Sequence, residues 1–564
     1  MVPIENPGKI VRAKRLLRNP VFLLIAISFL TAVLLQSGEL GTSDTTHRLQ
    51  ATHSFWTSQP PVLPEEYPDF GAHGRDGKLY GWYGIGQSLL MLPSDVLGTY
   101  LERLPIFANY QSKDPTVRSI VVSYSTNTLV CVLTCLLCFR LLGLFDFTVN
   151  QRFVGVLAQL FGTTFLHYTQ NMTENNYIAL LTLTGLTFQY EWLRDGKRWA
   201  LVLGAVALGA NLLTRLTTGM DLLAVFLFLV LTAWFTNVRG SEFRSRASLY
   251  VRIAFPIYAL FLLLDRAYQY VRFGSFFSTY IQAFGQEWKR LNPSLPAAFP
   301  FETPFRVGFF GALFKPEKSI FLFDPLLLLA LLVAVFAWKC FRPEIKAYFV
   351  AFVVLLFAYV SFYAKFTDWS GDTAWGDRYV ATVAQLVALL AIPLLLRHRA
   401  QLGSTVWRVG LAILLISVII QISSVAFWCP LEGYQLSTLD PPTFVVWLRL
   451  KNVMAFALGR TRDWAGPINP DTITDNWDYL HITTWNFLPF LLKRVGETPA
   501  WVVQVLTLLW FALLAALISL LGFAARLLAK TQFHLPEYPS SGAPRSSSGS
   551  FEPLNASTSA VPQG

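Results

Sequence analysis

Residues 19–36 read NPVFLLIAISFLTAVLLQ and follow a basic segment, 1–18, whose last cations are Lys14, Arg15 and Arg18. A helix needs about 20 predominantly apolar residues to cross a bilayer, so this run is close to the required length. No small-residue pattern typical of signal-peptide cleavage follows the run. We therefore expect a retained membrane anchor whose basic N-terminus stays on the cytoplasmic side.

Similar apolar runs recur along the chain. They cover 119–142, 153–168, 175–192, 199–214, 219–236, 250–268, 321–338, 347–364, 379–396, 408–428 and 501–524. Only 14% of the residues are charged and 54% are hydrophobic, whereas a soluble domain is about 25% charged because it must wet its surface. The composition disfavours a soluble enzyme, a disordered scaffold and a nucleic-acid binder. It predicts an all-α polytopic membrane protein with about 12 transmembrane helices.

The distribution of Lys and Arg orients these helices. One further stretch, 85–101, is short and contains Pro93 and Asp95. If it does not cross the membrane, most Lys and Arg of the short connections lie on the cytoplasmic side, as the positive-inside rule requires. If it crosses, every later loop inverts and the bias points the wrong way. We therefore expect 85–101 to be re-entrant or to lie along the outer interface, with both termini cytoplasmic.

This topology divides the chain into five parts. They are the basic N-terminus 1–18, a transmembrane module at 19–428 with long outside loops at 37–118 and 269–320, an outside loop at 429–500, a last transmembrane helix at 501–530, and a tail at 531–564. The tail is rich in Ser, Pro and Gly, which predicts a disordered cytoplasmic extension. The chain shows no internal repeat and no matched pair of broken spans, which a repeat-built transporter tends to have.

Charged residues gather on the expected outer side, although such groups are costly near lipid unless water, a partner or a substrate solvates them. In the first group, residues 44–57 have the spacing of an amphipathic helix, with Asp44 and His47 near its start. Ser43 and Asp44 could simply cap that helix. Alternatively, Asp44 is an acid held at the membrane surface as a general base.

Two further groups also have a structural alternative. Residues 75–84, RDGKLYGWYG, contain Lys78, Tyr80 and Tyr83, and they read either as an aromatic-belt turn or as a phosphate site around Lys78. Glu174 follows a span, where it is either a helix first-turn acid favoured by the dipole or a functional acid.

The segment 368–379, DWSGDTAWGDRY, combines three acids, an Arg and two Trp between two spans. A plain connector rarely needs that mixture, so Asp368, Trp369, Asp372, Trp375 and Arg378 are candidate site residues. Arg215, in LLTRLTT, joins them as a cation at the outer end of a span, where the alternative is simple snorkelling.

The order of these motifs resembles the GT-C superfamily of integral membrane glycosyltransferases, in particular bacterial protein mannosyltransferases and lipid A aminoarabinose transferases. The resemblance covers about residues 20 to 400. It rests on Asp44, the DGKLYGWYG stretch up to Pro93, Glu174, LLTR at 212–215, LFDPLLLLALL at 322–332, and the 368–379 segment.

The resemblance implies a fold of GT-C type and an inverting transfer of a hexose or pentose from a polyprenyl-phosphate-linked donor to a glycan, lipid or protein acceptor. It implies that Asp44 takes the proton of the acceptor hydroxyl, and that Glu174 positions the acceptor or shares a metal. Fixed cations offset the charge of a leaving phosphate, and by resemblance these are Lys78, Arg215 and Arg378. The implied substrate-binding residues are His47, Tyr80, Tyr83, Asp368, Trp369, Asp372 and Trp375.

The motifs point to no definite cofactor, although Asp44, His47 and Glu174 could supply ligands to a divalent metal ion, since oxygen-rich sites leave no sharp spacing signal. The expected location is the bacterial cytoplasmic membrane, with the site on the periplasmic face and no nucleic-acid partner.

A transporter or flippase of lipid-linked saccharides is the alternative, but it would place charges along a central path. Charges inside the spans are few and lie near the ends, as Asp221 and Asp265 do. A surface-polysaccharide ligase would share the donor but usually lacks the first-loop acid.

Overall fold

In the computed structural model, the described residues are 18–530 without 109, 111–114, 172–173, 239, 429–430, 437–438, 440–441 and 461–483. The predicted basic N-terminus, apart from Arg18, and the predicted tail 531–564 therefore lie outside the described residues, as does part of the predicted loop 429–500.

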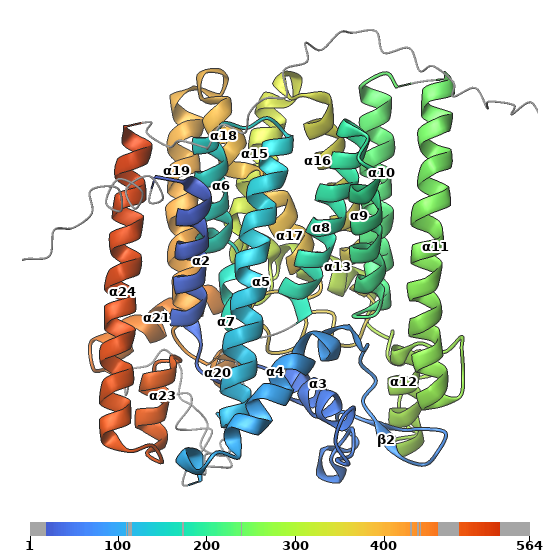
Figure 1. The fold of residues 1–564 in the computed structure, drawn as a ribbon, viewed down its shortest axis with the longest axis vertical. Helices are drawn as coiled ribbons and strands as arrows, with labels where there is room; N and C mark the ends of the chain where they lie inside the picture. The colour runs from blue at the N-terminus through green and yellow to red at the C-terminus, as the bar shows by residue number, and fades with distance from the viewer. Residues whose placement is uncertain are drawn as a thin grey trace, which may run out of the picture.

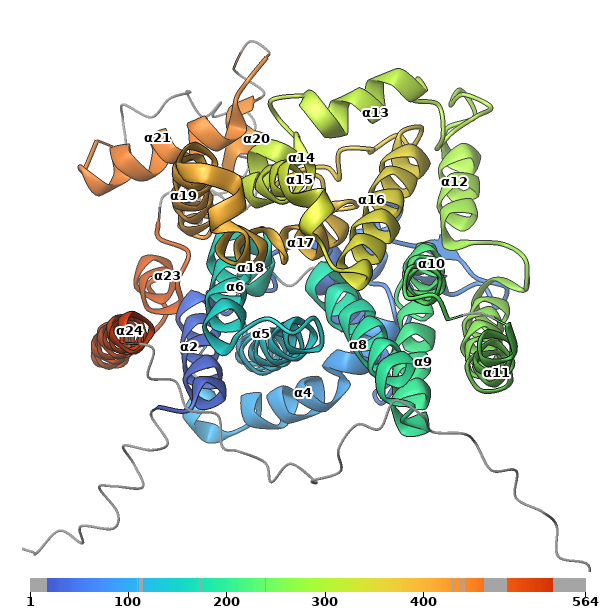
Figure 2. The same ribbon diagram turned by 90° about the horizontal axis from the view of Figure 1, so that it is seen from above.

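Helices that lie side by side form the body of the molecule (Figures 1 and 2). They are α2 (Pro20–Leu35), α5 (Val117–Leu144), α6 (Val149–Gly162), α8 (Glu174–Asp195), α9 (Arg198–Leu212), α10 (Gly219–Phe235), α11 (Gly240–Phe273), α15 (Pro325–Ala337), α16 (Pro343–Tyr363), α17 (Ala381–Ala388), α18 (Ala391–Arg397), α19 (Arg399–Ser424) and α24 (Ala500–Ala529). Each apolar run predicted to span a membrane overlaps one or two of these helices. The helical fold follows from the local apolar pattern.

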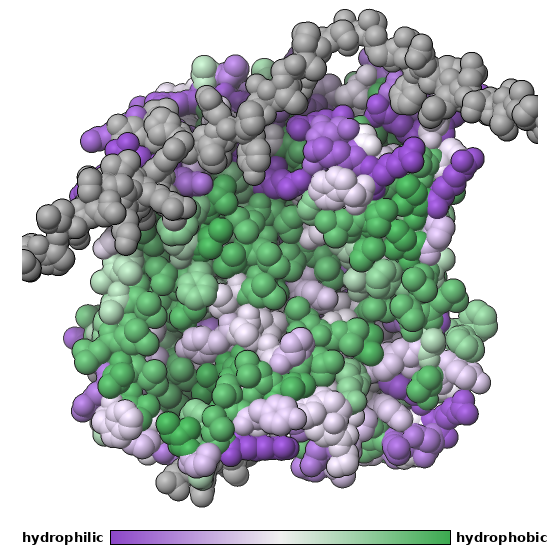
Figure 3. Space-filling view, in the orientation of Figure 1, coloured by the Kyte–Doolittle hydropathy of each residue, from purple (hydrophilic) through white to green (hydrophobic). Residues whose placement is uncertain are grey.

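Six helices of the described chain are long enough and apolar enough to cross a membrane. They cover Val117–Leu144, Leu216–Phe235, Gly240–Phe273, Pro343–Tyr363, Arg399–Ser424 and Ala500–Ala529. Several other helices are apolar but shorter, such as α2 with 16 residues, so the number of twelve spans stays a prediction. Figure 3 shows a broad hydrophobic surface between hydrophilic ends, as lipid contact requires. The chain is an integral membrane protein of helical fold.

Shorter elements complete the fold. They are α3 (Ser43–Ser54), η1 (Pro64–Glu66), α4 (Gly86–Glu102), η2 (Pro105–Phe107), α7 (Phe165–Gln170), η3 (Leu216–Thr218), α12 (Tyr280–Leu291), α13 (Phe305–Phe314), α14 (Ile320–Phe323), η4 (Trp338–Cys340), α20 (Leu431–Leu436), α21 (Val445–Ala457) and α23 (Leu488–Val495). Strand β1 (Ala72–His73) pairs antiparallel with β2 (Leu79–Tyr80). Figure 1 places α3, α4, α12 and β2 at one end of the bundle, and the start of α2 and the end of α24 at the other.

Helix α4 contains the stretch 85–101 that the charge pattern excluded from the spans. It lies at the same end as α3 and runs across the bundle (Figures 1 and 2), which is the orientation of an interfacial helix. Its Asp95 is fully buried and accepts hydrogen bonds from Trp56 at 2.8 Å and from His53 at 3.0 Å. These bonds tie α4 to α3, so the two helices form one platform at this end.

Candidate functional site

A pocket of about 280 Å³ lies at the end of the bundle that carries α3. Segments far apart in the sequence supply its charged walls. These residues are Asp44 and Arg48 of α3, Asp69, Glu174 at the start of α8, Arg215 after α9, and Asp368, Asp372 and Arg378 of the segment before α17. The fold thus brings Asp44, Glu174, Arg215 and Arg378, predicted separately from the sequence, into one site.

Asp44 is held by two partners, one on each carboxylate oxygen. Arg378 donates from Nη1 to Oδ2 at 2.8 Å, and the Tyr83 hydroxyl donates to Oδ1 at 2.9 Å. Burial alone would raise the pKa of Asp44, but the charges of Arg378 and Arg48 and the two hydrogen bonds outweigh it and lower the pKa to about 2. The carboxylate is therefore ionised at neutral pH.

Glu174 binds two guanidinium groups at once. Arg48 donates to its Oε2 at 2.6 Å and Arg215 donates to its Oε1, and the Glu174 side chain is only 2% exposed. Together with Asp44 and Arg378, these residues form a cluster of three guanidinium groups and two carboxylates. Within this cluster the guanidinium groups outnumber the carboxylates by one, and guanidinium groups can pair with an anionic ligand.

Three acids outside this cluster also line the pocket. They are Asp69, Asp368 and Asp372. Burial and the charge of Asp372 raise the pKa of Asp368, although Arg378 opposes the shift. Carboxylates of this kind accept hydrogen bonds from hydroxyl groups, so the pocket can hold a ligand that is both anionic and rich in hydroxyls.

Two glycines allow the walls of the pocket to approach one another. Gly41, just before α3, has φ +78°, and a Cβ on it would lie 2.6 Å from Asn171. This contact sets the start of α3 against Asn171 at the end of α7. Gly86 donates its N–H to the Leu213 carbonyl at 2.8 Å, and a Cβ there would collide with Thr214. The stretch after Tyr83 is thereby set against the end of α9 that carries Arg215.

Sequence reasoning missed Arg48 and two tyrosines near Arg215, Tyr363 and Tyr379. Arg48 is 5% exposed and lies over the Tyr83 ring at 4.2 Å. Its position four residues after Asp44 places both on one helix face, a signal that the sequence contained. Tyr379 lies 5.2 Å from the Arg215 guanidinium and stacks on Tyr363 at 4.2 Å.

Three predicted substrate residues lie in contacts outside the charged cluster. His47 is 3.0 Å from Glu66 and stacks on Phe70 at 3.6 Å. Trp369 packs against Gly311 of α13, while Trp375 is 2% exposed and stacks on His167. These side chains position the surrounding segments and are not among the residues that line the pocket, whereas Tyr83, Asp368 and Asp372 are.

Lys78 and Tyr80 are also not among the residues that line the pocket. Lys78 is 70% exposed and lies 3.7 Å from Asp76, whose Oδ2 also accepts from the Tyr80 hydroxyl at 3.0 Å. Both line a neighbouring cavity instead. The sequence placed Lys78 with Arg215 and Arg378 because all three lie on the same side of the membrane, but the β1–β2 turn carries it away from them.

The candidate metal ligands are separated by their ion pairs. Asp44 binds Arg378, His47 lies against Glu66, and Glu174 binds two arginines. Among the described residues, no group of three or more His, Cys, Asp or Glu side chains is placed to hold a metal ion. The observed donor set of Asp44, His47 and Glu174 therefore does not fit a metal ion as it stands.

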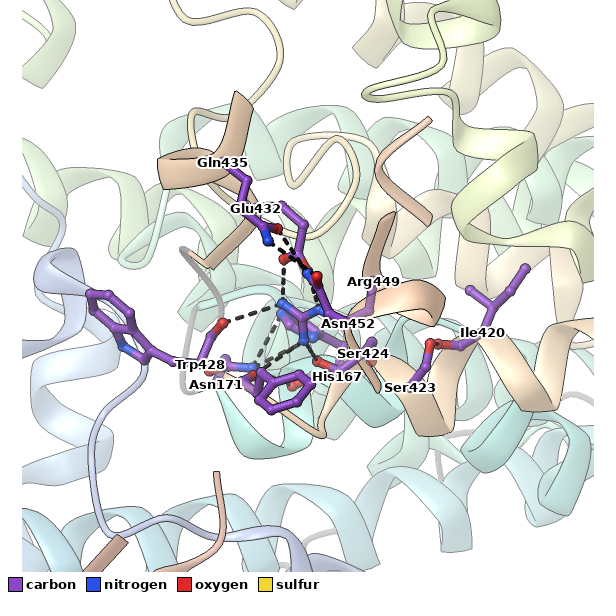
Figure 4. Close-up of polar contacts among 12 residues, drawn as sticks. His167, Asn171, Ile420, Ser423, Ser424, Trp428, Glu432, Gln435, Arg449 and Asn452 are labelled. Atoms are coloured by element: carbon purple, nitrogen blue, oxygen red, sulfur yellow. Dashed lines mark hydrogen bonds and ion pairs between the residues drawn. The ribbon is translucent and has the colours of Figure 1, made fainter. Parts of the chain in front are cut away.

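A second buried charge cluster, which was not predicted, lies between α20 and α21 (Figure 4). Arg449 of α21 is fully buried and donates from Nε and Nη2 to Glu432 of α20, both at 2.5 Å. Its Nη1 donates to the Ser424 carbonyl at 2.7 Å. The guanidinium lies 5.2 Å from the Trp375 ring, so this cluster supports the segment that ends in Arg378.

An apolar groove adjoins the charged pocket. It has a volume of about 880 Å³ and lies between α10, α11, α12 and α16, where its walls include Leu223, Ala259 and Phe362. Four residues line both the groove and the pocket, namely Tyr280, Ile281, Tyr363 and Phe366. The site therefore combines a charged pocket with an apolar groove.

The fold and the site define a helical integral membrane protein with a charged pocket at one end of its bundle. No protein-family model and no curated protein matches the chain. Among solved structures it is similar to the apo oligosaccharyltransferase of Archaeoglobus fulgidus, at 12% identity and a TM-score of 0.45, over 79% of this chain and 60% of that one. The chain thus spans 60% of the length of that archaeal protein.

It is also similar to ArnT from Cupriavidus metallidurans. In the apo state the identity is 14% and the TM-score 0.43, and in the structure bound to undecaprenyl phosphate they are 15% and 0.41. Both ArnT matches cover 91% of this chain and 77% of that one.

Proposed function

We propose that the chain is a glycosyltransferase that moves a sugar from a polyprenyl-phosphate-linked donor to an acceptor hydroxyl at the outer face of a bacterial cytoplasmic membrane. One observation carries the proposal. An ionised carboxylate, Asp44, lies among three guanidinium groups in a pocket that joins an apolar groove. The order of the sequence motifs, which resembles that of GT-C glycosyltransferases, supports the same function.

The apolar groove and the charged pocket match the two halves of such a donor. The prenyl tail would lie in the groove between α10, α11, α12 and α16, while the phosphate and sugar would lie in the charged pocket. Arg215 and Arg378 are the phosphate ligands in this proposal because both line the pocket. Lys78 is not a ligand of the donor phosphate in this proposal, because Lys78 lines a different cavity.

The chemistry requires a base and a stabilised leaving group. An acceptor hydroxyl is a weak nucleophile, so a carboxylate must accept its proton during attack on the anomeric carbon. The acceptor oxygen forms the new bond, the bond between the anomeric carbon and the phosphate oxygen breaks, and the electron pair leaves with the phosphate. Arg378 and Arg215 offset the charge that grows there. A displacement in line inverts the anomeric centre.

Glu174 has a supporting role in this mechanism. Both of its oxygens accept from arginines, so it orients Arg215 and Arg48 toward the pocket. Asp368, Asp372 and Asp69 are available for the hydroxyl groups of the sugar. None of these steps is routed through a metal ion.

The transporter alternative fits the structure less well. Asp221 is buried and accepts from the Tyr359 hydroxyl at 2.9 Å, while Asp265 pairs with Arg266 at 2.5 Å. Each has a partner on one carboxylate oxygen, and neither lines the charged pocket. The charges of the pocket thus gather at one end of the bundle, and Asp221 and Asp265 do not extend them into a central path.

The test uses the full chain in lipid nanodiscs with undecaprenyl phosphate as the probe. We expect binding to the wild type and a loss of about tenfold or more in Arg215→Ala and Arg378→Ala, since a charged hydrogen bond contributes about 1.5–3 kcal/mol. Arg244→Ala, on an exposed part of α11, is the control. Asp44→Asn should keep binding undecaprenyl phosphate, fold and insert normally, and lose transfer of the sugar. Absence of binding to the wild type would remove the proposed donor.

A further inference from the structure

A second large cavity lies beside the charged pocket, away from the apolar groove. It has a volume of about 760 Å³ and is enclosed by α3, the segment 54–64, strand β2 and the end of α11. Arg48, Tyr83 and Gly84 line both this cavity and the charged pocket. No residue that lines it also lines the apolar groove. The charged pocket is therefore approached from two separate sides.

Tyr83 stands at the boundary between the cavity and the pocket. Its hydroxyl donates to Asp44 at 2.9 Å, and its ring lies under the Arg48 guanidinium. A hydroxyl group that enters from the cavity would meet Asp44 at the position that the Tyr83 hydroxyl occupies.

The charged residues that line the cavity are all cations. They are Arg48, Lys78 and Arg272, with no Asp or Glu among the described lining residues. Arg272 is 4% exposed, and it donates to the carbonyls of Gly81 and Tyr83 and to Gln269. Lys78 faces water, and its contact with Asp76 at 3.7 Å is a loose, solvated pair.

The remaining wall mixes apolar residues, such as Pro61 and Val62, with polar and aromatic ones. Tyr80 and Tyr268 offer ring faces, and Ser54, Thr57 and Gln59 offer hydrogen-bonding groups. Such a wall of cations, rings and hydroxyls is complementary to a sugar that carries a negative charge.

We propose that this cavity binds the acceptor, and that the acceptor is a saccharide bearing phosphate or carboxylate groups. This inference rests on the proposed function, because a transferase needs a second substrate at Asp44. The acceptor hydroxyl replaces the Tyr83 hydroxyl on Asp44 and gives up its proton to the carboxylate. Its oxygen then bonds to the anomeric carbon while the phosphate leaves into the charged pocket.

Two matched substitutions separate the acceptor cavity from the donor groove. Ala51→Trp fills the cavity and Ala259→Trp fills the groove, since each alanine lines one chamber only. The probes are glucose 6-phosphate, glucuronate, glucose, inorganic phosphate and undecaprenyl phosphate, each added to the full chain in nanodiscs. Sugar binding is measured with undecaprenyl phosphate already present, so that the charged pocket is occupied.

We expect Ala51→Trp to lose the anionic sugars and to keep undecaprenyl phosphate, and Ala259→Trp to show the reverse. Glucose 6-phosphate or glucuronate should bind the wild type about tenfold more tightly than glucose, and Lys78→Gln should remove most of that preference.

Three results would overturn the acceptor site. They are unchanged binding of the anionic sugars in Ala51→Trp, equal affinity for glucose and the anionic sugars, and inorganic phosphate binding as tightly as glucose 6-phosphate. Binding of the sugars without binding of undecaprenyl phosphate would instead contradict the proposed donor and leave the cavity assignment standing.

Discussion

The carboxylate of Asp44 is bound by Arg378 on one oxygen and by Tyr83 on the other. The base of the proposed reaction is thus held by one of the groups assigned to the donor phosphate. A phosphate in the pocket would compete for Arg378. Without that cation, burial would raise the pKa of Asp44 and make the carboxylate a stronger base. The ion pair therefore couples donor binding to the strength of the base.

The coupling predicts a specific pH dependence. A general base acts only when it is deprotonated, so transfer falls as the pH drops through its pKa. With a pKa of about 2 in the free protein, kcat/KM should show no acid limb above pH 4, whereas the acid limb of kcat should lie at higher pH. In Arg378→Gln the acid limb of kcat/KM should also move upward. Rates measured from pH 4 to 8 check this, and an acid limb near pH 6 in wild-type kcat/KM would indicate another base.

Glu174→Gln tests whether this acid acts through the arginines. The substitution leaves Arg48 and Arg215 buried without their carboxylate, which should destabilise the protein by about 3–5 kcal/mol. The pocket also gains positive charge, so undecaprenyl phosphate should bind more tightly. Thermal unfolding and ligand titration of the same sample measure both effects. Unchanged affinity would instead favour a direct contact of Glu174 with the acceptor.

At the scale of elements, the helices followed from the sequence because an apolar run is a local property. The site followed only in part. Asp44, Glu174, Arg215 and Arg378 stand out as charges between spans, but their pairing depends on close approaches between segments that are 41 residues apart for Glu174 and Arg215 and 334 apart for Asp44 and Arg378. Lys78, which the resemblance grouped with Arg215 and Arg378, lines a different cavity because it lies in the short β1–β2 hairpin. Arg449 and Glu432 lay in a loop whose packing no local pattern indicated.

The approach of α3 to α8 predicts a contrast between two glycines. Gly41 and Gly77 have similar positive φ angles, +78° and +79°, but a Cβ on Gly41 would meet Asn171, whereas a Cβ on Gly77 would meet nothing within 4 Å. Gly77→Ala should cost about 1 kcal/mol for its backbone conformation alone. Gly41→Ala should cost more and lower transfer, because it separates Asp44 from Glu174. Thermal stability and activity of the pair check this, and equal effects would contradict it.

The cluster between α20 and α21 predicts a non-additive pair of substitutions (Figure 4). Arg449→Met alone leaves Glu432 buried without its partner, and Glu432→Leu alone leaves Arg449 unpaired, so each should destabilise by about 3–5 kcal/mol. The double variant should be more stable than either single variant. Because Arg449 lies against Trp375, all three should weaken undecaprenyl phosphate binding through the Arg378 segment. Additive losses in thermal unfolding would show that the two side chains are energetically independent.

At the scale of the whole molecule, the charged pocket opens on a groove within a body whose surface is made for lipid. A prenyl tail that moves from the bilayer into this groove leaves one apolar environment for another, so it gains little hydrophobic free energy. Affinity in a membrane should therefore come from the phosphate and its arginines. In nanodiscs, undecaprenol should bind at least tenfold more weakly than undecaprenyl phosphate, while shortening the prenyl chain of the phosphate should change the affinity little. Competition titrations with both series measure this. Undecaprenol that competes as well as undecaprenyl phosphate would place the recognition in the groove and not in the charged pocket.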